Sequence, residues 1–303
     1  MIIGVPKEIK SHEYRVGLTP GSVKELVGRG AEILVETNAG IGVGLSDEMF
    51  VNAGASIVNN ADAIFDRSEM VIKVKEPQPS ECVKLNKGQT LFTYLHLAPD
   101  PHQTELLLAS GCTAIAYETV TSNDGSLPLL VPMSQVAGRM SIQAGAHCLE
   151  KASGGSGMLL GGVPGVSPAK VVVIGGGVVG TNAVRMAMGM EAAVTVLDKS
   201  LNRLIELDFQ FGSKLNTIYA TDETLEHYVT NADLVIGAVL VAGAKAPKLV
   251  TRDMLKKMRN GSVVADVAID QGGCFETSRA TTHADPTYVE EGIVHYCVAN
   301  MPG

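Results

Sequence analysis

The order of apolar runs along this chain restricts its fold more than any other feature. Short runs rich in β-branched residues alternate with helix-like segments over most of the 303 residues. In the first part of the chain, strands are expected at 2–5, 32–36, 70–74, 91–95 and 113–117, with helices at 22–28, 61–66 and 102–110. This alternation predicts βαβ units, and therefore parallel sheets covered by helices on both faces.

The alternation resumes after a glycine-rich stretch at 153–168, which we expect to be a flexible surface loop. Six further strands are expected, at 170–174, 193–197, 217–220, 234–239, 263–267 and 293–299. A turn cluster at 123–126, followed by Pro128 and Pro132, predicts a domain boundary near 128–132, with a helix from about 133 to 152.

Two α/β domains follow from this organisation. Residues 1–130 are expected to form a Rossmann- or flavodoxin-like substrate domain, and residues 131–303 a doubly wound parallel-sheet Rossmann domain.

Composition and charge exclude several classes of protein. Hydrophobic residues make up 46% of the chain and charged residues only 18%, so global disorder is excluded. The net charge of −8 argues against nucleic acid or an anionic membrane as the main partner. Lys7 and Glu8 precede any hydrophobic stretch, so we expect no signal peptide, and the apolar runs are too short to span a bilayer.

The cysteines point to a reducing compartment. The five are odd in number and scattered, and they never form C-x-x-C. We therefore expect free thiols, no metal site and a cytoplasmic location.

A glycine-rich motif follows the predicted strand at 170–174. It reads Gly175-Gly-Gly177-Val-Val-Gly180, opens a predicted helix, and is followed by a strand that ends before Asp198. A plain glycine turn would explain the motif alone, but this context is that of a dinucleotide-binding fingerprint. Gly175 permits the tight turn, Gly177 allows close approach of the pyrophosphate, and Gly180 allows helix–strand contact.

Asp198 predicts which dinucleotide is bound. Its carboxylate is placed to accept hydrogen bonds from the adenosine ribose and would repel a 2′-phosphate, which favours NAD over NADP. Lys199 and Arg203 are nearby cations able to offset part of that repulsion.

Polar residues follow several predicted strands, where ligands bind in open parallel sheets. They are Arg15, Lys75, His96 and Glu118 in the first domain, and Asp270 and Asn300 in the second. Each alone has a plainer explanation, such as a solvated charge, a structural histidine or, for Asp270, a turn cap. Together they suit a 2-amino or 2-hydroxy acid. Arg binds a carboxylate, Lys polarises a keto oxygen, His exchanges a proton, and a carboxylate stabilises an iminium ion.

Seven segments carry a family resemblance over essentially the whole chain. They are GVPKEIKSHEYRVGLTP (4–20), KVKEPQP (73–79), LFTYLHLAPD (91–100), LLGGVPGVSPAKVVVIGGGVVG (159–180), ADLVIGAVLVAGAKAPKLV (232–250), DVAIDQGGCFETSRATTH (266–283) and HYCVANMPG (295–303). Together they resemble bacterial alanine dehydrogenases. The resemblance implies NAD-dependent oxidative deamination of L-alanine to pyruvate and ammonium, the reverse reaction, and a homo-oligomer, commonly a hexamer.

The resemblance also implies roles for individual residues. His96 and Asp270 match catalytic positions, and Arg15 and Lys75 match substrate-binding positions; Asn300, at a predicted strand end, is a further expected substrate-binding residue. The positions matching cofactor contacts are Ser134, Gly175, Gly177, Val178, Val179, Gly180, Asp198, Arg203, Val239, Leu240, Val267, Ala268, Ile269, Asp270, Arg279, Val298, Ala299, Asn300 and Met301.

Three features depart from the family pattern. Ala220 stands where a serine is expected, and Glu191 replaces the usual glycine after the first Rossmann helix. Family members also continue past the Asn-Met-Pro segment with a segment that returns to the first domain, so residues 1–130 are expected to lack that segment here.

Three other functions stay open at this point. The NAD(H)-binding domain of a proton-translocating transhydrogenase shares the fold but does not need the His96/Asp270 pair. A saccharopine-type dehydrogenase fits the motifs less well. A truncated, non-catalytic NAD-binding module is the alternative from outside the enzymes.

Overall fold

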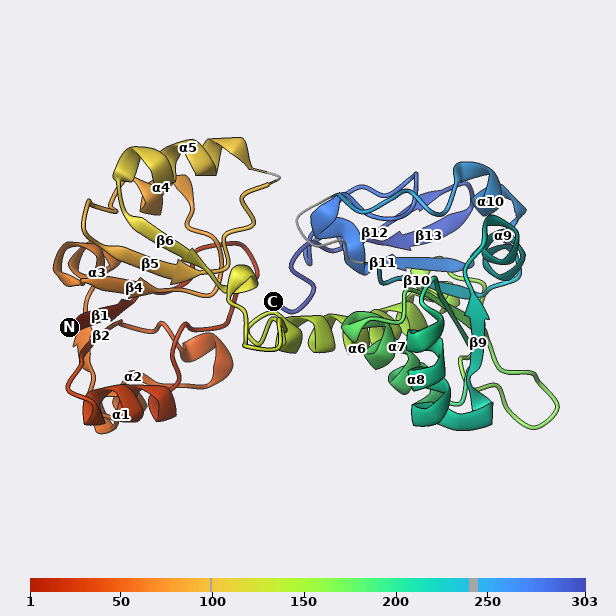
Figure 1. The fold of residues 1–303 in the computed structure, drawn as a ribbon, viewed down its shortest axis with the longest axis horizontal. Coiled ribbons are helices and arrows are strands. Elements are labelled where there is room, and N and C mark those ends of the chain that lie inside the picture. The colour runs from red at the N-terminus through yellow and green to blue at the C-terminus, as the bar shows by residue number, and fades with distance from the viewer. Residues whose placement is uncertain (99, 240–244) are drawn as a thin grey trace. The chain divides into compact units, whose positions relative to one another are not determined.

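A computed structural model describes residues 1–98, 100–239 and 245–303, in which the chain forms two units (Figure 1). Unit 1 comprises Met1–Leu130 with Gly303, and unit 2 comprises Val131–Pro302. Each unit is built on a wholly or mainly parallel sheet, so the predicted α/β class is confirmed.

The sheet of unit 1 has six parallel strands in the order β3-β2-β1-β4-β5-β6. The strands are β1 (Ile2–Val5), β2 (Glu32–Glu36), β3 (Ser56–Val58), β4 (Met70–Ile72), β5 (Thr90–Thr93) and β6 (Thr113–Ala116). The helices are α1 (Pro20–Gly28), α2 (Asp47–Asn52), α3 (Ala61–Arg67), α4 (Pro79–Cys82) and α5 (Pro101–Ser110), with short 3-10 turns η1 (Ile41–Val43) and η2 (Tyr117–Thr119). Because β1, β4, β5 and β6 are neighbours, the loops after them meet at one edge.

The sheet of unit 2 has seven strands in the order β12-β13-β11-β10-β7-β8-β9. The strands are β7 (Lys170–Ile174), β8 (Ala193–Asp198), β9 (Asn216–Tyr219), β10 (Leu234–Gly237), β11 (Val263–Asp266), β12 (Thr287–Glu290) and β13 (Ile293–Tyr296). All pair in parallel except β12, which runs antiparallel to β13. The order reverses between β7 and β10, the switch point at which doubly wound sheets bind ligands.

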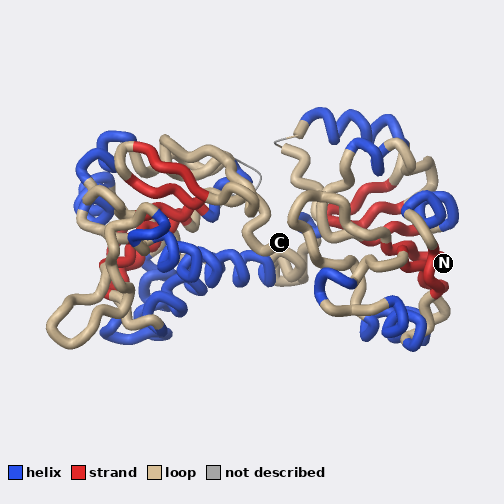
Figure 2. The backbone as a smooth tube through the Cα atoms, turned by 180° about the vertical axis from the view of Figure 1, so that it is seen from behind, coloured by secondary structure: helices blue, strands red, loops and turns tan. Residues whose placement is uncertain are grey.

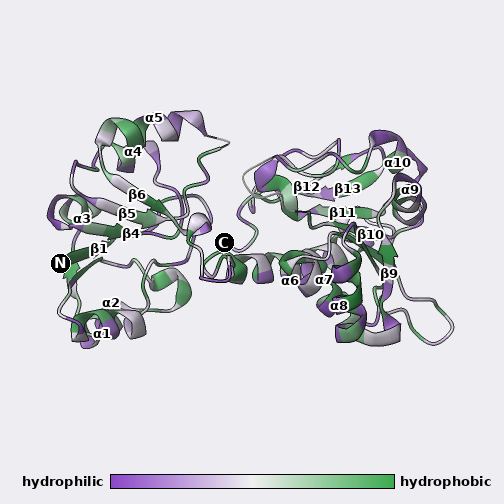
Figure 3. Ribbon diagram, viewed as in Figure 1, coloured by the Kyte–Doolittle hydropathy of each residue, from purple (hydrophilic) through white to green (hydrophobic). Residues whose placement is uncertain are grey.

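Helices cover both faces of this second sheet (Figure 2). They are α6 (Val131–Cys148), α7 (Val178–Gly189), α8 (Leu201–Phe211), α9 (Asp222–Thr230) and α10 (Arg252–Lys257), with 3-10 turns η3 (Lys151–Ser153), η4 (Gly212–Lys214) and η5 (Val267–Gln271). Successive residues of β7 point to opposite faces. Val171 and Val173 join the core under α6 and α7, whereas Val172 and Ile174 join the core under α9 and α10. Apolar residues accordingly concentrate along the strands (Figure 3).

Several predicted boundaries were wrong. Strands expected to end at 74, 95, 117, 239, 267 and 299 end at Ile72, Thr93, Ala116, Gly237, Asp266 and Tyr296. Except at Lys73, the over-predicted residues are apolar or aromatic, so the apolar run continues past the last residue that pairs in the sheet. The helix expected at 133–152 spans Val131–Cys148, and β3, β12, α2 and α4 were not predicted.

The glycine-rich stretch at 153–168 is not simply a surface loop. Leu160 is only 2% exposed and belongs to the core of unit 2. The backbone N–H of Ser156 donates to the carbonyl of Gly261, and that of Ala169 donates to the carbonyl of Leu160. Val163 and Val166 are exposed and form a short bridge, and Leu159 is exposed as well, so the stretch is only partly at the surface.

Three further observations concern thiols, membrane spans and metal sites. All five cysteines are free thiols, as predicted. None of the helices in the described ranges has the length and apolar character needed to cross a membrane. Within the same ranges, no group of three or more His, Cys, Asp or Glu side chains is arranged to hold a metal ion.

Candidate active site

Four of the polar residues predicted at strand ends lie in loops at one edge of the unit 1 sheet. Arg15 lies in the loop after β1, Lys75 after β4, His96 after β5 and Glu118 in η2 directly after β6. These strands are neighbours in the sheet and run parallel, so their carboxyl ends share one edge. The predicted grouping of these residues therefore follows from the topology.

Arg15 is held by a buried carboxylate that sequence reasoning missed. Its Nε donates to Oε1 of Glu13 at 2.8 Å and its Nη2 donates to Oε2 at 2.5 Å. The backbone N–H of Arg15 also donates to Oε1 of Glu13, at 3.0 Å. This bidentate pairing fixes the plane of the guanidinium. The E-x-R spacing in the loop was the signal available in the sequence.

Lys75 is buried beside a second carboxylate. Its Nζ lies 3.6 Å from Oε2 of Glu76, and Glu76 also forms an ion pair with Lys10. Burial alone would raise the pKa of Glu76, but the ammonium groups of Lys75 and Lys10 overcome this and hold that pKa below its ordinary value. Lys75 thus has a carboxylate beside it in a buried position.

His96 has a backbone conformation that is uncommon for a residue with a side chain. Its φ is +48°, and its imidazole stacks on the ring of Tyr94 with centroids 5.8 Å apart. The Glu118 carboxylate accepts the backbone N–H of His96 at 2.7 Å and that of Leu95 at 3.1 Å. The amide of Gln103 donates to the carbonyl of Leu95 at 2.9 Å. These bonds offset the roughly 1–3 kcal/mol that a left-handed non-glycine residue costs.

The glycine motif of unit 2 forms a tight turn from β7 into α7. Gly175 has φ +98°, and a methyl group there would lie 2.9 Å from the carbonyl oxygen of Ala238 and 3.1 Å from Val239. Gly177 is the N-cap of α7 without a side-chain cap, and nothing lies within 4 Å of the position where its Cβ would be. The first turn of α7 thus has no side-chain cap at Gly177 and open space beside it, and the N–H groups and dipole of such a helix start suit a phosphate group.

Gly180 offers a direct stability test of this turn. A methyl group on Gly180 would overlap the carbonyl oxygen of Gly175. We expect Gly180→Ala to destabilise the chain by about 1–3 kcal/mol because overpacking forces the backbone to shift. Gly189, at the other end of α7, has open space around it and is the matched control; Gly189→Ala should be neutral or stabilising by up to about 1 kcal/mol. Thermal unfolding of both variants is the measurement, and equal midpoints would contradict the prediction.

Asp198 and Arg203 both reach the glycine turn. Oδ2 of Asp198 accepts the N–H of Gly176 at 2.7 Å, and Oδ1 accepts the N–H of Ser200 at 2.8 Å. Nε of Arg203 donates to the carbonyl of Gly176 at 2.6 Å, and Nη2 donates to Thr181 Oγ1 at 2.6 Å. The carboxylate and the guanidinium thus bind the N–H and the carbonyl of the same residue, Gly176.

A second buried carboxylate, also missed from the sequence, shapes the loop that carries Asp270. Asp266 is 0% exposed and accepts hydrogen bonds from the N–H of Ala268 (3.1 Å), the N–H of Cys274 (2.9 Å) and the hydroxyl of Ser278 (2.5 Å). Burial raises the pKa of Asp266, although these bonds oppose the shift. Asp270 itself is exposed within η5, and the capping role considered for it belongs to Asp266. An aspartate ending an apolar strand was the available signal.

The remaining predicted cofactor positions lie on several elements of unit 2. Val178 and Val179 open α7, and Val267, Ala268 and Ile269 lie in η5. Ser134 lies on α6, one turn before Gly138, where a methyl group would overlap the carbonyl of Val179. Arg279 stacks on Tyr288, 3.9 Å from its ring centroid. Leu240 lies outside the described residues.

The chain turns sharply after β13, at residues 298–301. Asn300 has φ +65°, and its carbonyl accepts from Nε2 of His283 at 2.9 Å. Val298 and Met301 are buried in the core of unit 2, and Asn300, which lies between them, is also buried.

Two of the three departures from the family pattern, Ala220 and Glu191, are structurally mild. The N–H of Ala220 donates to the carbonyl of Asp198 at 3.0 Å, so the backbone there is held without a hydroxyl. Glu191 follows α7 with φ +64°, the left-handed conformation in which glycine is normally preferred.

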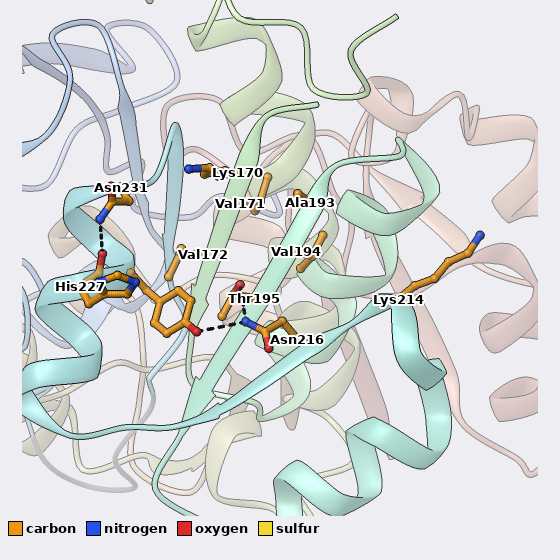
Figure 4. A pocket seen from close by; sticks show the side chains of 11 residues that line it. Lys170, Val171, Val172, Ala193, Val194, Thr195, Lys214, Asn216, His227 and Asn231 are labelled. Carbon is orange, nitrogen blue, oxygen red and sulfur yellow. Dashed lines mark hydrogen bonds between the residues drawn. The ribbon is translucent and has the colours of Figure 1, made fainter. Parts of the chain in front are cut away.

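A hollow of about 470 Å³ lies at the opposite end of the unit 2 strands from the glycine turn (Figure 4). Lys170 and Ala193 line it at the amino ends of β7 and β8. Asn216 bridges Thr195 Oγ1 and the hydroxyl of Tyr228 at 3.2 and 3.3 Å. Its lining contains none of the predicted site residues.

Comparisons with known proteins identify what this arrangement is similar to. The family described as alanine dehydrogenase/PNT matches through its N-terminal domain at residues 4–137 and its C-terminal domain at 141–303. Alanine dehydrogenase of Halomonas elongata is 62% identical over 303 residues, covering all of this chain and 82% of the relative. Alanine dehydrogenase of Bacillus subtilis is 56% identical, covering all of this chain and 80% of the relative.

Solved structures give the same result. An L-alanine dehydrogenase has a TM-score of 0.95 at 54% identity, covering all of this chain and 83% of that one. A transhydrogenase from Sinorhizobium meliloti has a TM-score of 0.84 at 26% identity, covering 99% and 87%. The dehydrogenases are thus much more similar in sequence than the transhydrogenase.

Proposed function

This chain belongs to the alanine dehydrogenase/PNT family, and on that premise we propose that it interconverts L-alanine and pyruvate plus ammonium with NAD as cofactor. The observation that carries the proposal is the 54–62% identity to alanine dehydrogenases across the whole chain. The placement of Arg15, Lys75 and His96 at neighbouring strand ends supports it. The alternatives, a transhydrogenase domain or a non-catalytic module, are not favoured.

The residues present fit a bound dinucleotide. The open space at Gly177 and the N–H groups of the first turn of α7 would hold the pyrophosphate. The Asp198 carboxylate would accept hydrogen bonds from the hydroxyl groups of the adenosine ribose. The nicotinamide, when bound, supplies the hydride acceptor for C2 of alanine. Ser134, Arg203, Val239, Arg279 and the 267–270 and 298–301 segments complete the proposed cofactor site.

The preference for NAD can be tested at Asp198. Removing the carboxylate in Asp198→Ala removes its repulsion of a 2′-phosphate while Arg203 stays in place. We expect the ratio of kcat/KM for NADPH over NADH to rise by about tenfold or more, the factor that corresponds to roughly 1.4 kcal/mol. Asp208→Ala, on the exposed side of α8, is the control. Equal use of both cofactors by the unaltered protein would disprove the argument.

In the proposed mechanism, Arg15 and Lys75 hold the substrate. The Arg15 guanidinium, oriented by Glu13, binds the carboxylate of alanine or pyruvate. The Lys75 ammonium donates to the keto oxygen of pyruvate and polarises its carbonyl. Asn300 is the third proposed substrate-binding residue.

His96 and Asp270 are the proposed catalytic residues. Once C2 of alanine is oxidised to an iminium carbon, His96 accepts a proton from water as it adds to that carbon. His96 then returns a proton to the amino group, and the carbinolamine collapses to pyruvate and ammonium. The Asp270 carboxylate stabilises the cationic iminium electrostatically.

Two assays test the proposal directly. L-Alanine should support reduction of NAD, and pyruvate with ammonium should support oxidation of NADH. A purified chain that binds NADH but turns over neither substrate pair would disprove the enzymatic assignment.

The proposal extends to organisation. We assign substrate binding to residues 1–130 and NAD binding to residues 131–303, in a cytoplasmic homo-oligomer that the family resemblance makes a hexamer. Light scattering of the purified protein tests the last point.

A further inference from the structure

Three ionisable side chains form a buried cluster in unit 1 that the proposed mechanism does not use. Lys73 is 0% exposed, and its Nζ lies 3.1 Å from Oε2 of Glu8 and 2.6 Å from Oε1 of Glu81. Burial alone would lower the pKa of Lys73, but the two carboxylates overcome this and raise it. A buried ion cluster is weak evidence for stability, because desolvation offsets much of the attraction. The contacts that Glu8 makes outside this cluster are more informative about function.

The other oxygen of Glu8 binds backbone amides. Oε1 accepts the N–H of Val74 at 2.6 Å and the N–H of Lys75 at 3.3 Å. The carbonyl of Val74 accepts the N–H of Tyr94 at 3.3 Å, and the carbonyl of Lys75 accepts the hydroxyl of Thr93 at 2.9 Å. All four polar backbone groups of residues 74 and 75 are therefore paired, three of them with partners outside regular strands.

Glu8 acts where the sheet has ended. β1 stops at Val5 and β4 stops at Ile72, so no β1 carbonyl is available to accept the N–H of Val74. The Glu8 carboxylate accepts this N–H instead of a strand carbonyl. On the side of β5, hydrogen bonding continues beyond the strand, because the N–H of Tyr94 donates to the carbonyl of Val74. Lys73 in turn holds the second oxygen of Glu8 and fixes the direction of the carboxylate.

We infer that Glu8 is a positioning residue for substrate binding. It fixes the backbone from which the Lys75 side chain extends, and it does so from the same loop that carries Arg15. The inference rests on the proposed function, in which Lys75 and Arg15 bind the substrate. Glu8 itself touches no reacting atom.

A matched pair of variants separates positioning from charge. In the full chain carrying Lys73→Met and Glu81→Gln, no buried ammonium is left unpaired. Glu8→Gln in that background keeps an amide oxygen for the Val74 N–H, whereas Glu8→Leu has no acceptor. We expect Glu8→Leu to raise the KM for pyruvate by about ten- to a hundredfold, the scale of a misplaced binding group, with the KM for NADH unchanged. Glu8→Gln should keep the KM for pyruvate close to that of its background.

Other outcomes overturn the inference. Equal KM values for pyruvate in the Gln and Leu variants, or a Leu variant that weakens pyruvate and NADH alike, would reduce Glu8 to a structural residue. Exposed Glu105→Ala on α5 is the control for loss of a carboxylate.

Amide hydrogen exchange decides the case independently of turnover. In the wild-type chain, the amides of Val74 and Lys75 should be protected like that of Val71 inside β4, although they lie beyond the strand. Unprotected amides would overturn the inference even if the variants do not fold. If the wild type turns over neither substrate pair, the proposed function fails. Anchoring by Glu8 is then judged by faster exchange at these amides in Glu8→Leu than in Glu8→Gln, and equal exchange would refute it.

Discussion

Replacing His96 with alanine is expected to lower kcat for L-alanine oxidation by about 10²–10⁴-fold, the usual contribution of general acid–base catalysis. The imidazole is the group in this site suited to exchanging protons near neutral pH. The truncation keeps the backbone N–H of residue 96, which Glu118 accepts. Steady-state kinetics in both directions, with NADH binding followed by fluorescence, is the measurement.

A second catalytic variant and a control variant accompany the His96 prediction. Asp270→Asn should also reduce kcat with NADH binding retained, because the neutral amide no longer stabilises a cationic iminium. His102→Ala, on the exposed side of α5, should leave kcat unchanged. Full activity in His96→Ala would remove the imidazole from the mechanism, whatever the outcome at Asp270.

Replacing Asp266 with alanine is expected to destabilise the chain by about 3–5 kcal/mol. The carboxylate accepts the N–H groups of Ala268, Cys274 and Phe275 and the hydroxyl of Ser278. Each buried donor left without an acceptor costs roughly 1–3 kcal/mol, and these costs are only partly additive. The thermal midpoint should fall by roughly 10 °C for a unit of this size.

The Asp266 prediction is checked against a surface carboxylate. Asp208→Ala lies on the exposed side of α8 and should change stability by no more than about 0.5 kcal/mol. An Asp266→Ala variant that unfolds at the wild-type midpoint would show that water replaces the carboxylate, and that the loop from Val267 to Ser278 does not depend on it.

Most of the fold could be predicted because buried parallel strands are continuous apolar runs. Residues 2–5, 32–36 and 170–174 are strands with the expected bounds. β3 was not predicted because its three residues are too few to show a period. β12 was not predicted because the surrounding pattern favours parallel strands joined by crossover helices. It instead pairs with β13 through a two-residue turn at Glu291 and Gly292, both with positive φ.

The candidate site was predictable in part and for a clear reason. Arg15, Lys75 and His96 follow separate strands, and only the rule that parallel strands share a carboxyl edge brings them together from sequence. Three of the residues that hold the site were not predictable this way: Glu13 for Arg15, Glu8 for Lys75 and Asp266 for the loop of Asp270. They act through backbone amides and a guanidinium, and such partners depend on loop geometry that a periodic pattern does not encode.

The position of Glu8 limits how this scaffold can be redesigned. One side chain from the segment after β1 secures the backbone of the segment after β4, and Lys73 ties both to α4 through Glu81. If only one of these two segments came from another enzyme, for example to accept a bulkier amino acid, Glu8 or its partners after β4 would be replaced and the contact between the segments would be lost. Recombination of this unit should therefore exchange residues 6–19 and 73–82 as a single block.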